Sequence, residues 1–197
     1  CKILEEIYNN KLDCNISIKP SHIGTDINNK IFFDNLKKIH SKACLKDNFI
    51  RIDMEDSKLT DITLDAYIQS SKDNNNIGLV LQAYLYRSKN DLNKLRDDSN
   101  VRICKGIYIE NDRISIKDPK KINENYIELL KIAFNKQIYT AIATHDPILI
   151  ENSLKIIKSM NVNKSMFEFQ MLYGVPMKNH IKNILKHNYK VRLYVPF

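Results

Sequence analysis

Residues 77–84 read IGLVLQAY, an apolar run that only Gln82 interrupts with a strongly polar side chain. A run of this length and composition is typical of a strand buried on both faces, as in a parallel sheet. Six comparable runs lie on either side of it: NISIK (15–19), FIRIDM (49–54), VRICK (101–105), YTAIAT (139–144), MFEFQM (166–171) and KVRLYV (190–195). We therefore predict seven strands.

The segments between these runs carry apolar residues at helical spacing, and residues 90–97 predict one shorter helix. The stripes are Ile31, Leu36 and Ile39; Leu64, Tyr67 and Ile68; Ile122, Tyr126, Leu129, Leu130 and Ala133; Ile148, Leu154, Ile157 and Met160; and Ile181, Ile184 and Leu185. Strict alternation of strands and helices predicts an α/β fold whose parallel sheet is either open or closed into a barrel. No glycine-rich phosphate loop follows the first strand, which disfavours a dinucleotide-binding fold.

The composition excludes several classes of protein. The 197 residues are 43% hydrophobic and 27% charged, as expected for one globular domain over residues 1–197. No run of about 18 apolar residues predicts a membrane-spanning helix, and no secretory signal opens the chain. The first residue is Cys1, so we expect the chain to start inside a longer protein. The four cysteines form no Cys-x-x-Cys pair, which favours reduced thiols and predicts no metal site.

The formal net charge of +8 raises the question of nucleic acid. The basic residues alternate with acidic ones, and the chain has neither an Arg-rich run nor basic residues interleaved with aromatic ones. We therefore predict no nucleic-acid binding.

Nearly every predicted strand has a polar residue at or near its carboxyl end. These residues are Lys19, Asp53, Glu55, Gln82, Arg102, Lys105, Thr144, His145, Asp146, Glu168, Gln170, Arg192 and Tyr194. Burying a charge without a partner is costly, and the carboxyl ends of parallel barrel strands converge where active sites form. Any single residue could be a rim residue in a local ion pair, but the whole set predicts a site. Within the set, Lys19, Gln82, Arg102 and Lys105 supply cationic and amide groups, which suit an anionic ligand or an electron-rich cofactor such as reduced flavin.

Seven strings, in order along essentially the whole chain, resemble the proline dehydrogenase family, in particular its single-function bacterial members. They are SIKPSHIG (17–24), IDMEDS (52–57), LVLQAYLYRS (79–88), VRICKGIY (101–108), ATHD (143–146), FEFQMLYG (167–174) and VRLYVPF (191–197). The resemblance implies a distorted (βα)8 TIM-type barrel that binds FAD non-covalently. It also implies oxidation of L-proline to 1-pyrroline-5-carboxylate by hydride transfer to the flavin, with electrons passed to a quinone.

The resemblance also implies residue roles. It implies that Lys19 pairs with the substrate carboxylate. It also implies that the side chains of Tyr108, Leu172 and Tyr194 surround the proline ring. It makes Asp53 an active-site acid and puts Arg102 near the reactive flavin nitrogen. The FAD contacts that it implies are Met54, Gln82, Arg102, Lys105, Gly106, Ile107, Thr144 and His145.

In two places this sequence departs from the family pattern. The family has a strand before SIKP, so these seven strands would be about strands two to eight. Past YVPF it has a helix with two adjacent arginines that clamp the proline carboxylate, whereas this sequence stops at Phe197. We therefore expect residues 1–197 alone to bind proline poorly and to aggregate through unpaired sheet edges.

Two alternatives remain open from the sequence. One is a flavin barrel that oxidises hydroxyproline or a related cyclic amino acid, and the other is a non-catalytic basic binding protein. The resemblance implies peripheral membrane contact, on the cytoplasmic side of the inner membrane for a bacterial protein and in the mitochondrion for a eukaryotic one.

Overall fold

The structure is a computed structural model that describes residues 2–72 and 74–196. The chain forms two compact units. The first unit comprises the residues up to Val80 together with Tyr108–Glu110, and the second comprises Leu81–Ile107 and the residues from Asn111 onward.

The first unit holds two complete strands and most of a third, with helices between them. Its elements are α1 (Lys2–Asn9), β1 (Ile16–Ile18), η1 (Ser21–Ile23), α2 (Asn29–Leu45), β2 (Ile50–Ile52), η2 (Ser57–Leu59), α3 (Thr60–Ser70) and the greater part of β3 (Ile77–Gln82). The strands are parallel, with Ile18 opposite Ile52 and Ile52 opposite Leu79. Buried isoleucine and leucine side chains form the interior here, as the apolar runs predict.

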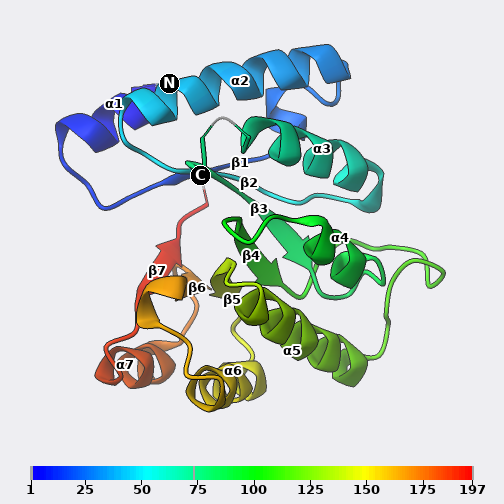
Figure 1. Cartoon of the computed structure of the whole chain (residues 1–197), viewed down its shortest axis with the longest axis vertical. Coiled ribbons are helices and arrows are strands. Elements are labelled where there is room, and N and C mark those ends of the chain that lie inside the picture. The colour runs from blue at the N-terminus through cyan, green and yellow to red at the C-terminus, as the bar shows by residue number, and fades with distance from the viewer. Residues whose placement is uncertain (1, 73, 197) are drawn as a thin grey trace. The chain divides into compact units, whose positions relative to one another are not determined.

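Local sequence explains where the long helix of this unit begins and ends. Asn28 precedes α2, and its side-chain oxygen accepts a hydrogen bond from the backbone N–H of Ile31 at 2.9 Å. Asp47 follows the helix with φ of 46°, a left-handed conformation that stops helical propagation. The buried side of α2 includes Phe32 and Leu36, and α2 packs against α3 (Figure 1).

The second unit continues the alternation of strands and helices. Its elements are the end of β3, α4 (Ser88–Lys94), β4 (Asn100–Cys104), α5 (Pro119–Asn135), β5 (Tyr139–Ala143), α6 (Pro147–Ser159), η3 (Lys164–Met166), β6 (Phe167–Leu172), α7 (Lys178–Lys186) and β7 (Val191–Tyr194). Strands β4 to β7 are hydrogen-bonded in chain order, and each neighbouring pair is parallel. Helix α5 packs against both α4 and α6 (Figure 1).

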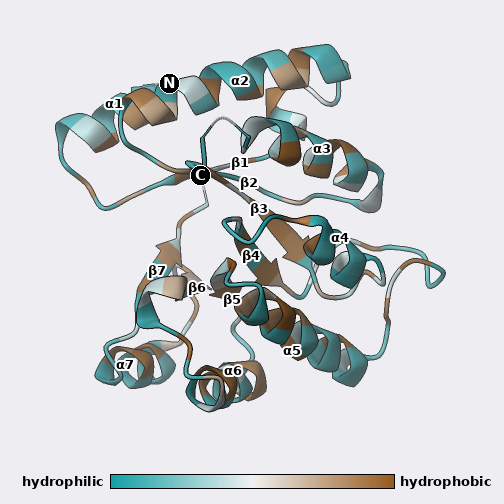
Figure 2. Ribbon diagram, in the orientation of Figure 1, coloured by the Kyte–Doolittle hydropathy of each residue, from teal (hydrophilic) through white to brown (hydrophobic). Residues whose placement is uncertain are grey.

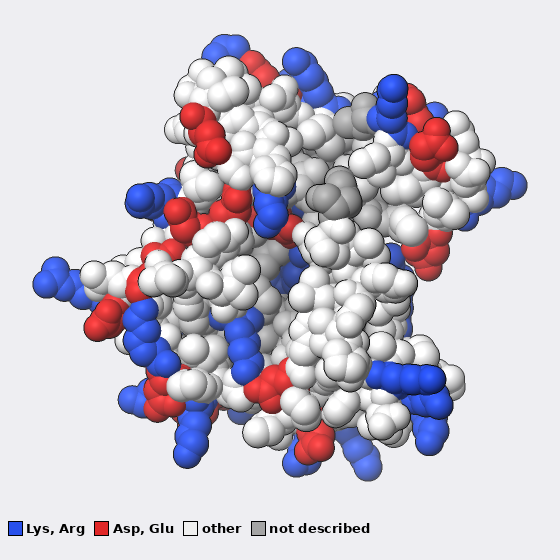
Figure 3. Space-filling model, turned by 180° about the vertical axis from the view of Figure 1, so that it is seen from behind, with Lys and Arg blue, Asp and Glu red and all other residues white. Residues whose placement is uncertain are grey.

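The hydropathy of the strands differs from that of the helices that pack around them. Strands β3 and β4 are largely hydrophobic, whereas α5 and α6 each have a hydrophobic and a hydrophilic side (Figure 2). Phe167 packs edge-on against Phe134 and Phe169, so aromatic side chains join α5 to β6. On the surface, Lys and Arg are interspersed with Asp and Glu on the face shown in Figure 3. No helix in the described part of the chain is both long and apolar enough to cross a membrane.

The predicted α/β class, the seven strands and their parallel pairing are confirmed. Two helical details differ from the prediction. Helix α1 was not predicted, and it buries Leu4 and Ile7. Helix α4 lies at Ser88–Lys94 rather than at residues 90–97, because Leu95 adopts an extended conformation with ψ of 151°.

Candidate active site

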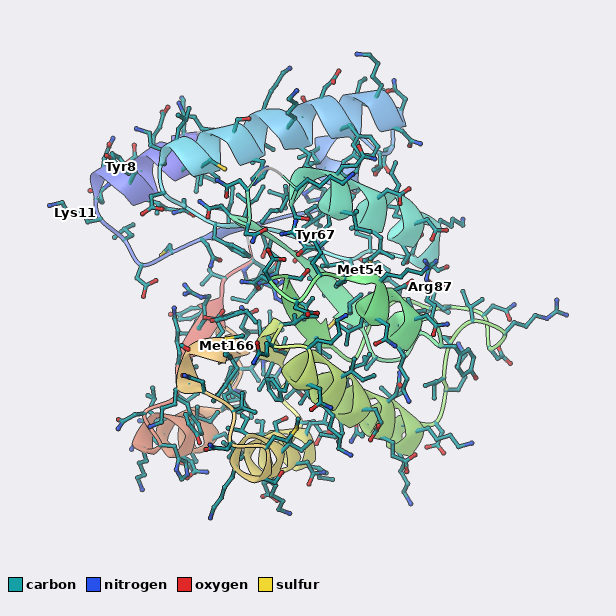
Figure 4. The ribbon with its side chains drawn as sticks, viewed as in Figure 1. Tyr8, Lys11, Met54, Tyr67, Arg87 and Met166 are labelled. Carbon is teal, nitrogen blue, oxygen red and sulfur yellow. The ribbon has the colours of Figure 1, made fainter. Side chains whose placement is uncertain are left out.

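In the first unit, two of the predicted site residues lie at neighbouring strand ends. Lys19 follows β1, and Asp53 follows β2. The backbone N–H of Asp53 donates to the carbonyl of Ile18 at 2.9 Å, which extends the β1–β2 pairing to the point where both strands end. Asp53 is buried, whereas Lys19 is half-buried. The neighbouring Met54, labelled in Figure 4, is also buried.

Two carboxylates hold the loops that follow these strands. Glu55 accepts hydrogen bonds from the backbone N–H and hydroxyl of Ser21, both at 2.7 Å. Glu110 does the same for Ser57, at 2.6 Å from the N–H and 2.7 Å from the hydroxyl. Tyr108, predicted to wall the substrate, lies two residues before Glu110 in the same unit. These paired bonds fix the backbone around the predicted site residues.

In the second unit, the segments that follow β3 and β4 run side by side. Backbone N–H groups of Ala83 and Tyr84 donate to the carbonyls of Cys104 and Lys105 at 2.8 and 2.9 Å. The Asn125 side chain, from α5, donates to the Ala83 carbonyl at 2.6 Å. The buried Gln82 immediately precedes this pairing.

Gly106 follows Lys105 and lies against the Tyr84 ring of the neighbouring segment. Its φ is 101°, and a Cβ at this position would come within 2.2 Å of the Tyr84 ring. A side chain here would therefore be both strained and blocked. The sequence requires glycine at this turn because the Tyr84 ring fills the space that a Cβ would need.

Arg102, on β4, contacts one side chain from β6 and one from β7. Its Nε donates to Gln170 Oε1 at 2.5 Å, and its guanidinium carbon lies 5.1 Å from the centre of the Tyr194 ring. That distance is within the range of a cation–π interaction. Arg102 and Tyr194, assigned to cofactor and substrate respectively by the resemblance, are therefore in direct contact.

Lys105 pairs with Asp146 across the ends of β4 and β5, with 2.6 Å between Nζ and Oδ2. Asp146 also accepts from the Asn123 amide at 3.1 Å, and its backbone N–H donates to the hydroxyl of Thr144. Burial raises the pKa of the Asp146 carboxyl, but hydrogen bonds from Lys105, Asn123 and the Ile148 N–H outweigh it, so the pKa falls below its ordinary value. The carboxylate is therefore ionised at neutral pH, and it also caps α6 by accepting from the backbone N–H groups of Ile148 and Leu149.

His145 joins β5 to β6. Its Nε2 accepts a hydrogen bond from the Leu172 backbone N–H at 2.8 Å, which requires the neutral imidazole. Burial lowers the pKa of His145, in keeping with that state. Leu172 itself is 42% exposed and Ile107 is 89% exposed, so neither side chain packs into the core of this unit.

The predicted site residues are thus divided between the units. Lys19, Asp53, Met54 and Tyr108 belong to the first, and Gln82, Arg102, Lys105, Gly106, Ile107, Thr144, His145, Leu172 and Tyr194 to the second. Gln170, in the predicted polar set, holds Arg102, and the structure adds two residues of α5 that the sequence analysis did not name: Asn123 bonds Asp146 and Asn125 bonds the carbonyl of Ala83. The only sequence signal for the two asparagines is their polarity within the apolar stripe of α5.

Chemically, the second unit presents cations, amides and a hydroxyl at the ends of β3, β4 and β5. Such groups stabilise negative charge and donate hydrogen bonds to oxygen or nitrogen acceptors. Within residues 2–72 and 74–196, no group of three or more His, Cys, Asp or Glu side chains is arranged to hold a metal ion.

Comparison with known proteins assigns the family. The sequence model of the proline dehydrogenase family matches residues 2–197. The chain belongs to the proline dehydrogenase family. "Proline dehydrogenase 1" of Bacillus subtilis subsp. natto is 34% identical over 197 residues, which are 100% of this chain and 65% of that relative. "Proline dehydrogenase" of Deinococcus radiodurans is 33% identical over 202 residues, with the same coverage of 100% and 65%.

Solved structures extend the comparison to the fold. Proline utilization A from Bdellovibrio bacteriovorus matches 99% of this chain and 25% of its own, with a TM-score of 0.88 and 21% identity. The Bradyrhizobium japonicum protein of the same name matches 99% and 24%, with a TM-score of 0.85 and 20% identity. This proline dehydrogenase family chain therefore shares its fold with about a quarter of each of those longer proteins.

Proposed function

We propose that this chain forms part of an enzyme that oxidises L-proline to 1-pyrroline-5-carboxylate, with FAD as the hydride acceptor. Membership of the proline dehydrogenase family supports the substrate. The observation that carries the proposal is the buried Arg102, in the middle of β4, which is held by Gln170 and Tyr194. A cation fixed in this way is suited to stabilising the negative charge of a two-electron-reduced cofactor.

The donor set of the second unit fits FAD. Arg102, Gln82 and Lys105 carry the cationic and amide N–H groups that hydrogen-bond the acceptor atoms of a flavin ring or a phosphate. The Tyr84 ring fills the space beside Gly106, so the backbone that follows Lys105 is packed against that ring. FAD, when bound, supplies the acceptor for the hydride and its electrons.

The residues of the second unit have distinct proposed roles. Arg102 stabilises negative charge on the cofactor, and Gln82 hydrogen-bonds the isoalloxazine. Lys105, Gly106, Ile107, Thr144 and His145 bind the remainder of FAD. Leu172 and Tyr194 contact the proline ring, and the exposure of Leu172 supports a role in contact with a ligand. Positioning of the reacting C–H bond dominates catalysis in a transfer of this kind.

The roles proposed in the first unit concern the substrate and the order of the site. Lys19 pairs with the substrate carboxylate, Tyr108 contacts the proline ring and Met54 contacts the flavin. Asp53 is an active-site acid that holds neighbouring cations and hydroxyls. The burial of Asp53 and its place at the end of β2 support this assignment.

The remaining proposals concern the whole protein, since this chain spans 65% of the relatives named above. The seven strands form about strands two to eight of a distorted (βα)8 barrel. A quinone accepts the electrons, which implies peripheral contact with the membrane that holds the quinone. For a bacterial protein that membrane is the inner membrane on its cytoplasmic side, and for a eukaryotic one it is mitochondrial.

The test is the visible absorbance of the purified full-length protein. We expect a yellow protein that bleaches when proline is added and more slowly with hydroxyproline. Preferential bleaching by hydroxyproline would reassign the substrate, and a protein that stays colourless with added FAD would refute the proposal. Colourless protein that binds nucleic acid with a steep salt dependence would instead indicate a basic binding protein. N-propargylglycine, which inactivates the Bdellovibrio bacteriovorus protein, should inactivate this one as well.

A further inference from the structure

Four side chains on β4, β6 and β7 form a continuous hydrogen-bonded network. Arg102 Nε donates to Gln170 Oε1 at 2.5 Å, and Gln170 Nε2 donates to Glu168 Oε1 at 2.6 Å. Arg192 Nε lies 3.1 Å from both carboxylate oxygens of Glu168. Glu168, Gln170 and Arg102 are 2%, 4% and 8% exposed, so these bonds are shielded from water.

The chemistry of its neighbours fixes the orientation of the Gln170 amide. The Glu168 carboxylate can only accept hydrogen bonds, and the Arg102 guanidinium can only donate them. Gln170 must therefore turn its NH2 group to Glu168 and its oxygen to Arg102. A flipped amide would set oxygen against oxygen and N–H against N–H inside a buried sheet, where unmade hydrogen bonds are costly.

The network also restrains the direction of the guanidinium. Gln170 holds the Nε side of Arg102, while the Tyr194 ring lies 5.1 Å from its carbon. Two contacts from different strands define the plane of the guanidinium better than either contact alone. The charge of Glu168 is balanced at the far end by Arg192 and, at 3.7 Å, by Lys190.

Stability alone is a weak explanation for this arrangement. Burying ion pairs costs desolvation that their attraction often only offsets, and well-packed apolar side chains commonly do as well or better. A fully satisfied polar network does, however, specify one geometry for its members. The member whose geometry matters most is Arg102, which carries the cation of the proposed flavin site.

We propose that Gln170, oriented by Glu168, is a positioning residue that holds Arg102 in the conformation that stabilises reduced flavin. The inference rests on the proposed function and adds a determinant of the cofactor's redox potential. Gln170 acts through Arg102, so its effect on the potential exists only while Arg102 is present.

A double-mutant cycle in the full-length flavoprotein tests this dependence. The variants are Gln170→Leu, Arg102→Met and the two together, and the measured quantity is the midpoint potential of bound FAD. We expect Gln170→Leu to shift the two-electron equilibrium about tenfold toward oxidised flavin, which corresponds to about 30 mV. In the Arg102→Met background the same substitution should cause no further shift. An equal shift in both backgrounds would overturn the proposal.

Thr140→Val is the matched control. Thr140 is fully buried on β5, and its hydroxyl donates to the carbonyl of Ile138 at 2.9 Å, outside the network. The substitution removes a buried hydrogen bond from the same sheet without touching Arg102. We expect it to lower stability and leave the potential unchanged. If the midpoint potential fell in proportion to the loss of stability in both Gln170→Leu and Thr140→Val, the role of Gln170 would be structural only. That result would contradict the proposal.

A second measurement does not depend on flavin. The Nε–H of Arg102 should exchange slowly with solvent by NMR, and faster in Gln170→Leu but not in Thr140→Val. If the protein holds no FAD, the proposed function fails while this comparison still tests the positioning. Slow exchange that persists in Gln170→Leu overturns the positioning whether or not flavin is bound.

Discussion

Lys105 Nζ lies 2.6 Å from Asp146 Oδ2, and this ion pair joins the end of β4 to the residue that caps the amino end of α6. The other carboxylate oxygen, Oδ1, accepts from the backbone N–H of Ile148 at 2.9 Å. One side chain therefore sets the start of a helix and the position of a lysine proposed to bind FAD. Asn123, which also bonds Oδ2, ties α5 to the same carboxylate.

Two substitutions separate the contributions of Asp146. Asp146→Asn keeps an amide oxygen that can cap α6 but removes the charge that pairs with Lys105. Asp146→Ala removes both, and we expect it to lower the free energy of unfolding by about 1–3 kcal/mol, from the lost cap and buried partners. Urea unfolding of the full-length protein measures both variants. Asp118→Ala is the matched control, because Asp118 caps α5 in the same way ahead of Pro119. An Asp146→Ala effect no larger than this control would contradict a role for the ion pair.

The pH dependence of the unfolding free energy should report the ionisation of the Asp146 carboxyl. The pKa of Asp146 is lowered in the folded protein, so its charge stabilises the fold fully above the ordinary value of 3.8. That stabilisation is lost as the pH falls through the lower, folded pKa. The difference in unfolding free energy between the wild type and Asp146→Asn should therefore be constant down to about pH 4 and shrink below it. A difference that persists unchanged at pH 2 would contradict this assignment.

His145 should titrate below its ordinary pKa. Burial lowers its pKa from 6.5, and the neutral Nε2 accepts from the Leu172 N–H. Because the folded pKa is depressed, the stabilisation is complete above 6.5 and is lost as the pH falls through the folded value. The amide resonance of Leu172 should stay constant from pH 8 to 6.5 and move at lower pH. His145→Gln, which can accept but does not titrate, should not show this step, and a step at or above pH 6.5 in the wild type would refute the prediction.

The strands were predictable from the sequence because a buried parallel strand has to be apolar on both faces. IGLVLQ is fully buried in β3, and the other six runs contain their strands to within a residue. Helix α1 was missed because eight residues offer only two turns of periodicity. The end of α4 depends on the backbone of Leu95, which no pattern in the sequence determines.

The polar residues of the site were predictable for a related reason, since Arg102, Glu168 and Gln170 interrupt apolar runs. Their mutual contacts were not. Arg102 and Gln170 are 68 residues apart, and they meet only because β4, β5 and β6 pair in one register. A slip of one residue would turn either side chain to the opposite face of the sheet. The contact between Arg102 and Tyr194 depends on register in the same way.

Glu110 should hold the segment that carries Tyr108. Its carboxylate accepts two hydrogen bonds from Ser57, and bonds to a charged group contribute about 1.5–3 kcal/mol each. In Glu110→Ala we expect hydrogen exchange to accelerate across residues 107–112, because their anchor to η2 is lost. Asp112→Ala changes an exposed carboxylate two residues away and should leave exchange unchanged. Equal acceleration in the two variants would mean that Glu110 is no anchor.

Gly106 and Gly174 provide a comparison that separates backbone strain from steric exclusion. Both have positive φ, 101° and 88°, but a Cβ at Gly106 meets the Tyr84 ring at 2.2 Å while one at Gly174 meets nothing within 4 Å. Gly174→Ala should therefore cost only the backbone term, about 1–2 kcal/mol. Gly106→Ala should cost about 1–3 kcal/mol more, because the buried ring has to move.

Urea unfolding of the two variants measures the difference between these costs. FAD affinity supplies the second readout, because displacement of Tyr84 should disturb the chain segment proposed to bind the cofactor. We expect Gly106→Ala to weaken FAD binding and Gly174→Ala to leave it unchanged. Equal losses of stability would show that the Tyr84 ring yields freely, and the requirement for glycine at residue 106 would then lie in its backbone conformation alone.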